Sequence, residues 1–543
     1  MGITKPKSRL AVVGAWLLCA ARAVVAQAPA QQRPVTEPAV RVTTRLVEVS
    51  VVVRNKAGEP VADLTRDDFA LFDKGREQTI AIFHHESSPA HRPPPAPLPR
   101  NTFSNRFEET AGSPTSATAI LLDGLNTRFA DRAYARQQLV RFLEQVRPGD
   151  CVGVYALAQG LRVVHDLTRD AASLLRAIAE ENQRTSAERV EPEADESLAG
   201  WPQFDAWMGE VNRGVAEMAR ADRTLRTIRA LLAIANHLER VPGRKNLIWV
   251  AGQFPTWFDR AAVPTPEQLV RSPDNFGAEI ERTARALSNA GVAIYPIDAR
   301  GLVGAAEYGA DRASIRPDML GSSGGDFGAM MGLAERTGGR AFYNTNDIRD
   351  AIRRAVDDGR ESYILGYYPT HSQWDGRFRT IKVGVRPPGM KVLHRHGYFA
   401  LPEEPADDTR RQGVLEAAKW SPIDATRVGL TIRAGRIATG LELTMQIDPR
   451  DITLQLREGK WMGQLDVMMV QFALDERNLR TVSHTVNLKL DRRDYMLASE
   501  RGALILTERV ELVPGVAMLR VLVRDVRSGA LGSVSVPVSR LSS

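Results

Sequence analysis

The chain has 543 residues, 43% of them hydrophobic and 25% charged, with a net charge of +7. This length is too great for one hydrophobic core and indicates about three or four domains. The first 26 residues contain four basic residues and no acidic one, so the rest of the chain carries only +3. It has no basic stripe interleaved with aromatic residues, which argues against a nucleic-acid partner.

Residues 1–26 are typical of a secretory signal peptide. Three basic residues precede an apolar run from Leu10 to Ala21, and small residues follow at Val24–Ala26. The run is too short to cross a bilayer, so we expect a secreted or periplasmic protein with no membrane span in the mature chain. A lipid anchor on Cys19 is the alternative. Cys19 lies in this segment, so Cys151 would remain alone and no intrachain disulfide could form.

The next 90 residues predict a leader, a β module and a linker. Residues 27–39 are rich in Ala, Gln and Pro and predict a flexible leader. Residues 40–86 predict an N-terminal β module, because hydrophobic residues alternate from Val42 to Val53 and Asn55–Gly58 supplies a hairpin turn. Residues 87–116 include the run Arg92–Pro99 and predict a proline-rich linker without regular structure.

Residues 117–360 show an α/β pattern. The run Ala119–Leu122 has no polar alternation, which is typical of a strand buried on both faces, and Asp123 follows at its carboxyl end. Helical spacing then extends from Arg132 to Val146, and a second strand is expected from Cys151 to Ala158. Further strands are expected at residues 246–251 and 291–297. Strands that alternate with helices indicate a doubly wound, mainly parallel sheet.

Strand patterns return after residue 360. Residues 361–400 predict a β extension of about three strands, which is too small to form a core alone. We therefore expect either that it packs with residues 40–86 as one module, with the α/β segment inserted, or that the two are separate. Residues 413–543 predict a C-terminal all-β sandwich with turns at regular spacing.

The segment from Thr118 to Thr127 resembles the first strand and loop of a von Willebrand factor type A domain. In such domains the strand ends in D-x-S-x-S, the core of a metal-ion-dependent adhesion site, and this chain has Asp123, Leu125 and Thr127 at those spacings. Nearly the whole mature chain resembles the VWFA-related family of Acidobacteria, through PGD at residues 148–150, YPIDARGL at 295–302 and GYYP at 366–369. The resemblance implies a Rossmann-type α/β domain flanked by antiparallel, Ig-like β-sandwich modules.

The adhesion site that this resemblance implies is degenerate. Leu125 replaces one hydroxyl, and Ala251–Gln253 stands where the family has T-D-G, so the second acid is absent. We expect no cofactor; Mg²⁺ or Mn²⁺ held by Asp123 and Thr127 is the alternative. Without a metal, the Asp123 carboxylate would cap the loop by accepting backbone N–H groups, assisted by Asn126 and Thr127.

Open α/β sheets bind ligands at the carboxyl ends of their strands. The side chains expected there are Asp123, Asn126, Thr127, Asp298, Trp257 and Phe258. The two aromatic residues suit a protein-binding patch, or else they hold a long loop on the domain. We call this surface the carboxyl-end rim.

These observations predict an exported, non-catalytic recognition or adhesion protein whose rim binds a protein or an envelope polymer. One alternative is a hydrolase that uses Asp123, Asp298 and a histidine at the same rim. The other is a structural component of the cell envelope without a ligand. The sequence has neither a G-x-S-x-G elbow nor a phosphate-binding loop, which argues against two common enzyme classes.

Overall fold

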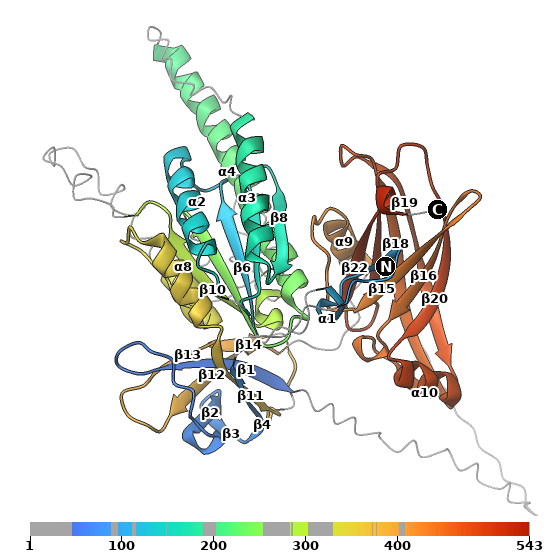
Figure 1. Cartoon of the computed structure of the whole chain (residues 1–543), viewed down its shortest axis with the longest axis horizontal. Coiled ribbons are helices and arrows are strands. Elements are labelled where there is room, and N and C mark those ends of the chain that lie inside the picture. The colour runs from blue at the N-terminus through green and yellow to red at the C-terminus, as the bar shows by residue number, and fades with distance from the viewer. Residues whose placement is uncertain are drawn as a thin grey trace, which may run out of the picture. The chain divides into compact units, whose positions relative to one another are not determined.

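The computed structural model describes residues 46–87, 96–110, 116–147, 149–187, 202–253, 283, 286–301, 330–371, 373–375, 377–400 and 408–541 (Figure 1). The chain divides into two units, and all of these residues belong to the second, Arg45–Ser543. The predicted signal peptide and leader lie outside the described residues. None of the helices in the described ranges combines the length and the hydropathy that crossing a bilayer requires.

Strands from both sides of the α/β segment build one pair of antiparallel sheets. The first sheet has the order β13-β1-β11-β4, with β1 at Val47–Arg54, β4 at Ile80–Ser87, β11 at Glu361–Tyr367 and β13 at Lys391–His394. The second has the order β14-β12-β2-β3, with β2 at Phe69–Asp73, β3 at Arg76–Gln78, β12 at Phe378–Val385 and β14 at Gly397–Phe399. Val49 and Leu365 of the first sheet share a core with Leu71 and Val383 of the second. Residues near 50 and near 370 therefore bury each other's apolar faces.

A five-stranded sheet forms the centre of the α/β segment. Its order is β10-β9-β6-β7-β8, with β6 at Ser116–Asp123, β7 at Val152–Leu157, β8 at Leu161–Thr168, β9 at Arg244–Ala251 and β10 at Val292–Asp298. Strands β10, β9, β6 and β7 are parallel, and β8 returns antiparallel to β7. The predicted mainly parallel sheet is confirmed, and its apolar runs are buried on both faces because helices cover both.

The helices divide between the two faces of this sheet. On one face α2 (Phe129–Leu143), α3 (Ala171–Ala187) and α8 (Ile348–Asp357) pack on the side that includes Ile120 and Val250. On the other face α4 (Pro202–Leu238) and helical residues 286–290 and 330–337 pack on the side that includes Leu121 and Trp249. Helix α8 buries Ile348, Ala351, Ile352, Ala355 and Val356, which is the three- and four-residue spacing of one helix face.

The PGD motif has a structural role in its described part, Gly149 and Asp150. The Asp150 carboxylate accepts hydrogen bonds from Nε and Nη2 of Arg360 at 2.9 and 2.6 Å. This bidentate pair ties Asp150, two residues before β7, to the end of the turn after α8, and Asp150 is buried.

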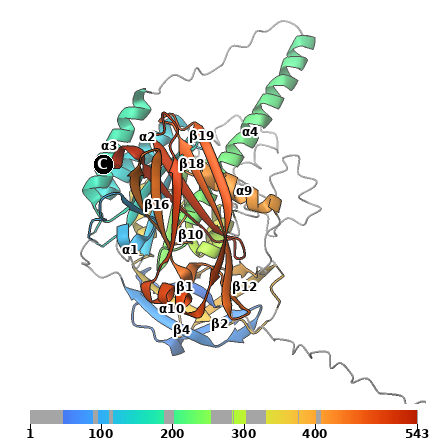
Figure 2. The same ribbon diagram turned by 90° about the vertical axis from the view of Figure 1, so that its right-hand side faces the viewer.

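The C-terminal part contains two further antiparallel sheets. One has the order β20-β16-β15-β5, with β5 at Thr102–Ser104, β15 at Leu430–Ile437, β16 at Gly440–Ile447 and β20 at Leu504–Glu511. The other has the order β17-β18-β21-β22, with β17 at Gln455–Arg457, β18 at Lys460–Phe472, β21 at Met518–Asp525 and β22 at Leu531–Pro537. Strand β19 (Asn478–Leu490) lies beside β18 (Figure 2). Leu443 and Val521, from the two sheets, share one core. We call this part the C-terminal sandwich; an Ig-like connectivity stays a prediction.

Two sequence interpretations need correction in this region. Residues 87–116 were expected to lack regular structure, but β5 and α1 (Phe107–Thr110) lie within them. Phe103 of β5 pairs opposite Ile432 of β15, so residues beyond the proline run gain a sheet partner that is far away in the sequence. The part expected to be all-β also contains α9 (Asp408–Lys419) and α10 (Arg492–Arg501). Helix α10 has an Asp491 N-cap and a left-handed Gly502 C-cap, signals that are visible in the sequence.

Candidate functional site

The strand register places two predicted acids at the same level of the parallel sheet. Leu122 of β6 lies opposite Val250 of β9, and Ala251 of β9 lies opposite Asp298 of β10. Asp123 is therefore level with Ala251 and Asp298 at the carboxyl end of the sheet. The strand β9 separates the two acids, which puts their backbones about 10 Å apart.

The Asp123 carboxylate is fully hydrogen-bonded inside the protein. Its Oδ1 accepts from the backbone N–H groups of Leu125 and Asn126 at 3.1 and 2.9 Å. Its Oδ2 accepts from Asn126 Nδ2 at 2.8 Å and from the Trp249 indole Nε1 at 2.9 Å. The residue is only 2% exposed. This is the loop-capping arrangement, with an indole donor added from the next strand.

All four donors to Asp123 are neutral, so none of them offsets the negative charge of the carboxylate. Burial raises the pKa of the Asp123 carboxyl above its ordinary value, and the hydrogen bonds from Asn126, Trp249 and Leu125 oppose that rise only in part. No cation contributes to holding the ionised form. The carboxylate therefore stabilises its loop more than it projects a negative charge to the surface.

The loop after β6 is fastened to the neighbouring strand and helix. Thr127 Oγ1 donates to the Asp123 carbonyl and accepts from Gly252 N at 2.9 Å, and Thr127 is 7% exposed. Asn126 accepts from Gln253 N at 2.9 Å through its carbonyl and donates through Nδ2 to Thr227 Oγ1 of α4 at 3.0 Å. The polar groups of this loop are thus engaged with β9 and α4.

Asp298 is satisfied in a different way, by its own neighbour. Its Oδ1 accepts from Arg300 N at 3.0 Å and from Arg300 Nε at 2.9 Å, and its Oδ2 accepts from Arg300 Nη2 at 2.9 Å. Asp298 is 1% exposed. The guanidinium neutralises this carboxylate within the turn that follows β10.

These contacts correct the expectation of accessible acids at the carboxyl-end rim. The structure brings Asp123, Asn126, Thr127 and Asp298 to one edge, but both carboxylates are buried because internal donors occupy their oxygens. The donor set does not fit Mg²⁺ or Mn²⁺, since Asp123 and Thr127 would have to break these bonds to become ligands. Among the described residues no group of three or more His, Cys, Asp or Glu side chains is arranged to hold a metal.

The same edge exposes apolar side chains. Phe129, the first residue of α2, is 61% exposed. Tyr343 is 42% exposed and follows Phe342, which bridges in parallel to Ile297 of β10, so Tyr343 is level with Asp298. Met331, near the start of helical residues 330–337, is 43% exposed. The predicted rim residues Trp257 and Phe258 lie outside the described residues.

Two residues of this site were absent from the sequence prediction. Trp249 was expected only as part of the strand at residues 246–251, and Thr227 was not singled out. Trp249 is two residues from the end of β9 and fully buried, and its N–H requires a buried acceptor. A tryptophan near the carboxyl end of a predicted buried strand was the available signal, but the register with Asp123 was not.

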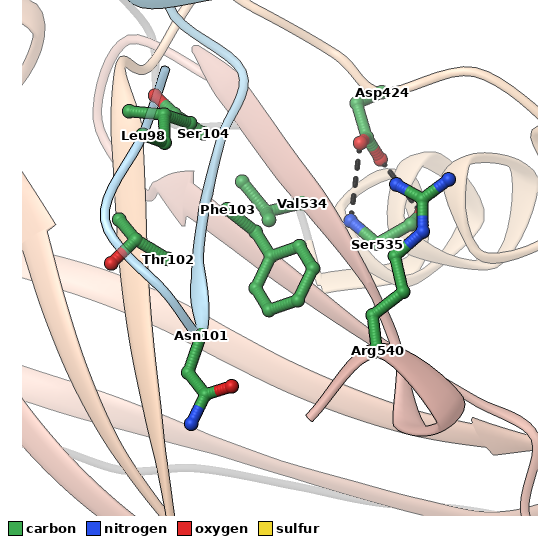
Figure 3. Close-up of a pocket in the computed structure, with 9 residues that line it drawn as sticks. All are labelled: Leu98, Asn101, Thr102, Phe103, Ser104, Asp424, Val534, Ser535 and Arg540. Carbon is green, nitrogen blue, oxygen red and sulfur yellow. Dashed lines mark hydrogen bonds between the residues drawn. The ribbon is translucent and has the colours of Figure 1, made fainter. Parts of the chain in front are cut away.

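A cavity lies in the C-terminal sandwich (Figure 3). Its volume is ≈ 370 Å³, and its lining includes Phe103, Val534, Ser535, Arg540 and Asp424. The Asp424 carboxylate accepts from Ser535 N and Oγ at 3.1 and 3.0 Å (Figure 3) and lies 3.2 Å from Arg520 Nη2. No histidine or cysteine lines it.

Cys151 is also an unsuitable nucleophile. It is buried, and burial raises the pKa of its thiol to about 12, so the reactive thiolate is not formed near neutral pH.

No protein-family model matches the chain, and no curated protein matches it. Several solved structures are similar to it. A von Willebrand factor type A protein from Catenulispora acidiphila has 11% identity and a TM-score of 0.24, with 63% of this chain and 77% of that one covered. An aerotolerance-related membrane protein from Bacteroides fragilis has 12% identity and a TM-score of 0.22, with 45% and 98% covered. The pilus adhesin SpaC from Lactobacillus rhamnosus GG has 9% identity and a TM-score of 0.26, with 77% and 54% covered.

At identities and TM-scores this low, these similarities carry no argument about fold or function. The α/β architecture rests instead on the strand order and the register described above.

Proposed function

We propose that the protein is an exported, non-catalytic recognition protein of the von Willebrand factor A type. In this proposal the carboxyl-end rim of the parallel sheet binds a protein partner, and no metal ion takes part. The partner contacts an apolar patch that we call the rim patch, made of Phe129, Met331 and Tyr343. The signal-like residues 1–26 support an envelope or extracellular location, where such a partner would be found.

The observation that carries the proposal is the exposure of two aromatic residues beside acids that are already satisfied. Phe129 and Tyr343 are 61% and 42% exposed, although each borders the edge where open α/β sheets bind their ligands. Large exposed aromatic side chains at such an edge suit protein contact, because burying them on binding supplies most of the energy of a typical interface.

The charge distribution at the rim favours the same kind of partner. Arg300 neutralises Asp298, and neutral donors hold Asp123, so neither acid is available to a cationic ligand or a divalent ion. A metal-dependent adhesion mechanism needs the opposite arrangement, with carboxylate and hydroxyl oxygens turned outward. Recognition at this rim therefore rests on apolar area and shape.

The test is capture of partners from the envelope and secreted fractions of the source organism. The bait is residues 27–543, which keep the whole compact unit Arg45–Ser543. It is compared with the double variant F129S/Y343S and with L474S as a matched control, since Leu474 is 91% exposed in the turn before β19. We expect proteins captured by wild type and L474S to be lost from the double variant. Equal capture by the double variant would contradict the proposal.

A further inference from the structure

The side chain of His237 near the end of α4 faces two hydrogen-bond acceptors at once. Its Nε2 lies 2.8 Å from Asp166 Oδ1 of β8, and its Nδ1 lies 2.7 Å from the Asp424 carbonyl oxygen. The residue is only 3% exposed. A neutral imidazole carries one N–H and cannot donate to both acceptors, whereas the imidazolium carries two. The geometry therefore selects the protonated ring.

The hydrogen bonds of Asp166 strengthen this assignment. Besides His237, its Oδ1 accepts from Tyr155 Oη at 2.8 Å and from Leu167 N at 2.7 Å. Because Asp166 Oδ1 already accepts two other hydrogen bonds, it does not donate one to the ring. A neutral ring without a proton on Nε2 would therefore place the Nε2 lone pair against an acceptor oxygen. The Asp166 side chain as a whole is half-exposed.

The other groups around the ring leave Asp166 as its charged partner. From α1, the Phe107 ring contacts His237 edge-on with centroids 5.3 Å apart. From β7, Tyr155 stays neutral, since burial and the Asp166 charge raise its pKa, and burial also keeps the nearby Cys151 thiol neutral. The Asp424 carboxylate accepts from Ser533 and Ser535 and pairs with Arg520, and its charge adds to the rise in the pKa of His237.

The Asp424 carbonyl belongs to a junction between α4 and the C-terminal sandwich. Thr426 N donates to Asn236 O at 3.1 Å, and Thr426 Oγ1 donates to His237 O at 2.8 Å. The same segment holds β22, because Ala425 and Ser533 exchange hydrogen bonds of 2.9 Å. His237 is the group in this junction whose ordinary pKa lies near neutral pH.

A neighbouring ion pair, unlike His237, contains a carboxylate that keeps its charge near neutral pH. Arg240, three residues after His237, lies with its Nη2 3.0 Å from Asp448 Oδ2 in the sandwich. Burial of Asp448 is outweighed by hydrogen bonds from Arg450 and Arg240, which lower the pKa of its carboxyl. The Asp448 carboxylate therefore keeps its charge across the pH range in which an imidazole loses its proton.

We propose that His237 forms a pH-sensitive link between the α/β segment and the C-terminal sandwich. Its imidazolium holds Asp166 and the Asp424 carbonyl together, and loss of one ring proton leaves one of these acceptors without a donor. The junction around residues 424–426 then loosens, together with the wall that Asp424 gives to the cavity in the sandwich.

The direction of the pH response follows from the two partners. Burial would lower the pKa of His237, but the Asp166 charge and hydrogen bond outweigh it and raise that pKa. A raised histidine pKa gives stabilisation that is complete below the ordinary value of about 6.5 and is lost as the pH rises through the folded value. For Asp166, burial is outweighed by His237, which lowers the pKa to about 2, so its contribution is lost only as the pH falls below about 4 towards that value. Both hydrogen bonds of His237 are therefore formed in mildly acidic solution, and one of them is lost on the alkaline side.

Hydrogen exchange with mass spectrometry tests the proposal on residues 27–543. Exchange rates of segments 233–241 and 424–428 are measured from pH 5 to pH 9.5 and corrected for the intrinsic pH dependence of exchange. We expect protection of both segments to fall by about tenfold or more on the alkaline side in wild type, and to be independent of pH in H237Q. The control is H484Q, because His484 makes an exposed pair with Glu508 at 3.0 Å and its loss should leave the wild-type response.

A second variant covers the case in which H237Q does not fold. D166N keeps the imidazole but removes the charge that holds its proton, so the midpoint of the loosening should move to lower pH. An unchanged midpoint in D166N, or a pH response in folded H237Q equal to that of wild type, would overturn the proposal. So would wild-type protection that is constant across the range.

Discussion

Asp123 and Asp166 are two acids of the same sheet, and their surroundings give them opposite behaviour. Asp123 receives four hydrogen bonds from neutral donors, and burial raises its pKa. Asp166 accepts from two neutral donors, Tyr155 Oη and Leu167 N, and also from a histidine cation, whose charge is the largest of the effects that lower its pKa to about 2. The charge of the donor, together with the greater exposure of the Asp166 side chain, moves the two carboxyl pKa values in opposite directions. Asp123 thus organises a loop, while Asp166 holds a proton on His237.

The same difference separates the two places where the protein can interact or respond. The two described acids of the carboxyl-end rim, Asp123 and Asp298, are both compensated, and the rim presents Phe129 and Tyr343, so it suits an apolar protein contact. The junction at Asp424 depends on an ion pair, so it suits a response to pH. Changing one partner of each acid tests this contrast.

Removing the Asp123 carboxylate should have the largest effect. In D123A the Leu125 and Asn126 N–H groups, the Asn126 amide and the Trp249 indole lose their common acceptor, and unpaired buried donors are costly. We expect the free energy of unfolding to fall by about 3 kcal/mol, measured by urea denaturation. In the control D475A, the lost carboxylate is exposed and bonds only to Arg477 N and Nε, so stability should stay within about 0.5 kcal/mol of wild type. Equal losses in the two variants would mean that the capping bonds do not matter.

The indole donor to Asp123 should matter next. W249F removes one of the two donors to Oδ2 and leaves a small void in a fully buried site. We expect a loss of about 2 kcal/mol, of which about half comes from the missing hydrogen bond and half from the void. In the double variant W249F/D123A the loss should be smaller than the sum of the two single losses, because both remove the same hydrogen bond. Strict additivity would show that the bond contributes nothing.

Neutralising Asp166 should have a smaller effect on stability and a clear effect on its pH dependence. D166N leaves an oxygen that can still accept, and the wild-type carboxylate is half-exposed, so we expect a loss of about 1 kcal/mol near pH 5.5. Because the pKa of Asp166 is lowered to about 2, wild type should lose this contribution as the pH falls from about 4 to 2. Urea denaturation across that range should show a shallower acid slope for D166N. A parallel slope would separate Asp166 from the acid response.

Divalent ions should have no effect on stability. Both oxygens of Asp123 and the Thr127 hydroxyl are occupied by internal hydrogen bonds, so this site does not gain from ion binding. We expect 5 mM Mg²⁺ or Mn²⁺, compared with EDTA, to change the melting temperature by less than about 1 °C. A larger increase that disappears in D123A would restore the metal alternative.

The parallel sheet was predictable because its strands have a recognisable local sequence pattern. Apolar runs such as Ala119–Leu122 and the strand ending at Asp298 have no polar alternation, which is typical of strands covered on both faces, and the mainly parallel sheet is confirmed. The short strand β5 gave no such signal. Its hydrogen bonds go to β15, more than 300 residues later, and local composition near a proline run indicates a linker.

The contacts that define both sites are as distant as that pairing. Trp249 and Asp123 are 126 residues apart, and His237 reaches across 187 residues to the Asp424 carbonyl. The sequence predicted which acid ends β6, and it also supplied the loop-capping interpretation of Asp123. It could not supply the strand register or the junction, so it placed an accessible carboxylate where the fold has a buried one.

The central claim is that the carboxyl-end rim recognises a partner through exposed aromatic residues and without a metal. The most direct measurement is the affinity of a captured partner for wild type, F129S/Y343S and D123A, by surface plasmon resonance in Mg²⁺ and in EDTA. The account predicts equal wild-type affinity in both media and a loss of at least about tenfold in F129S/Y343S. Binding that needs Mg²⁺ and Asp123, but not Phe129 or Tyr343, would contradict it.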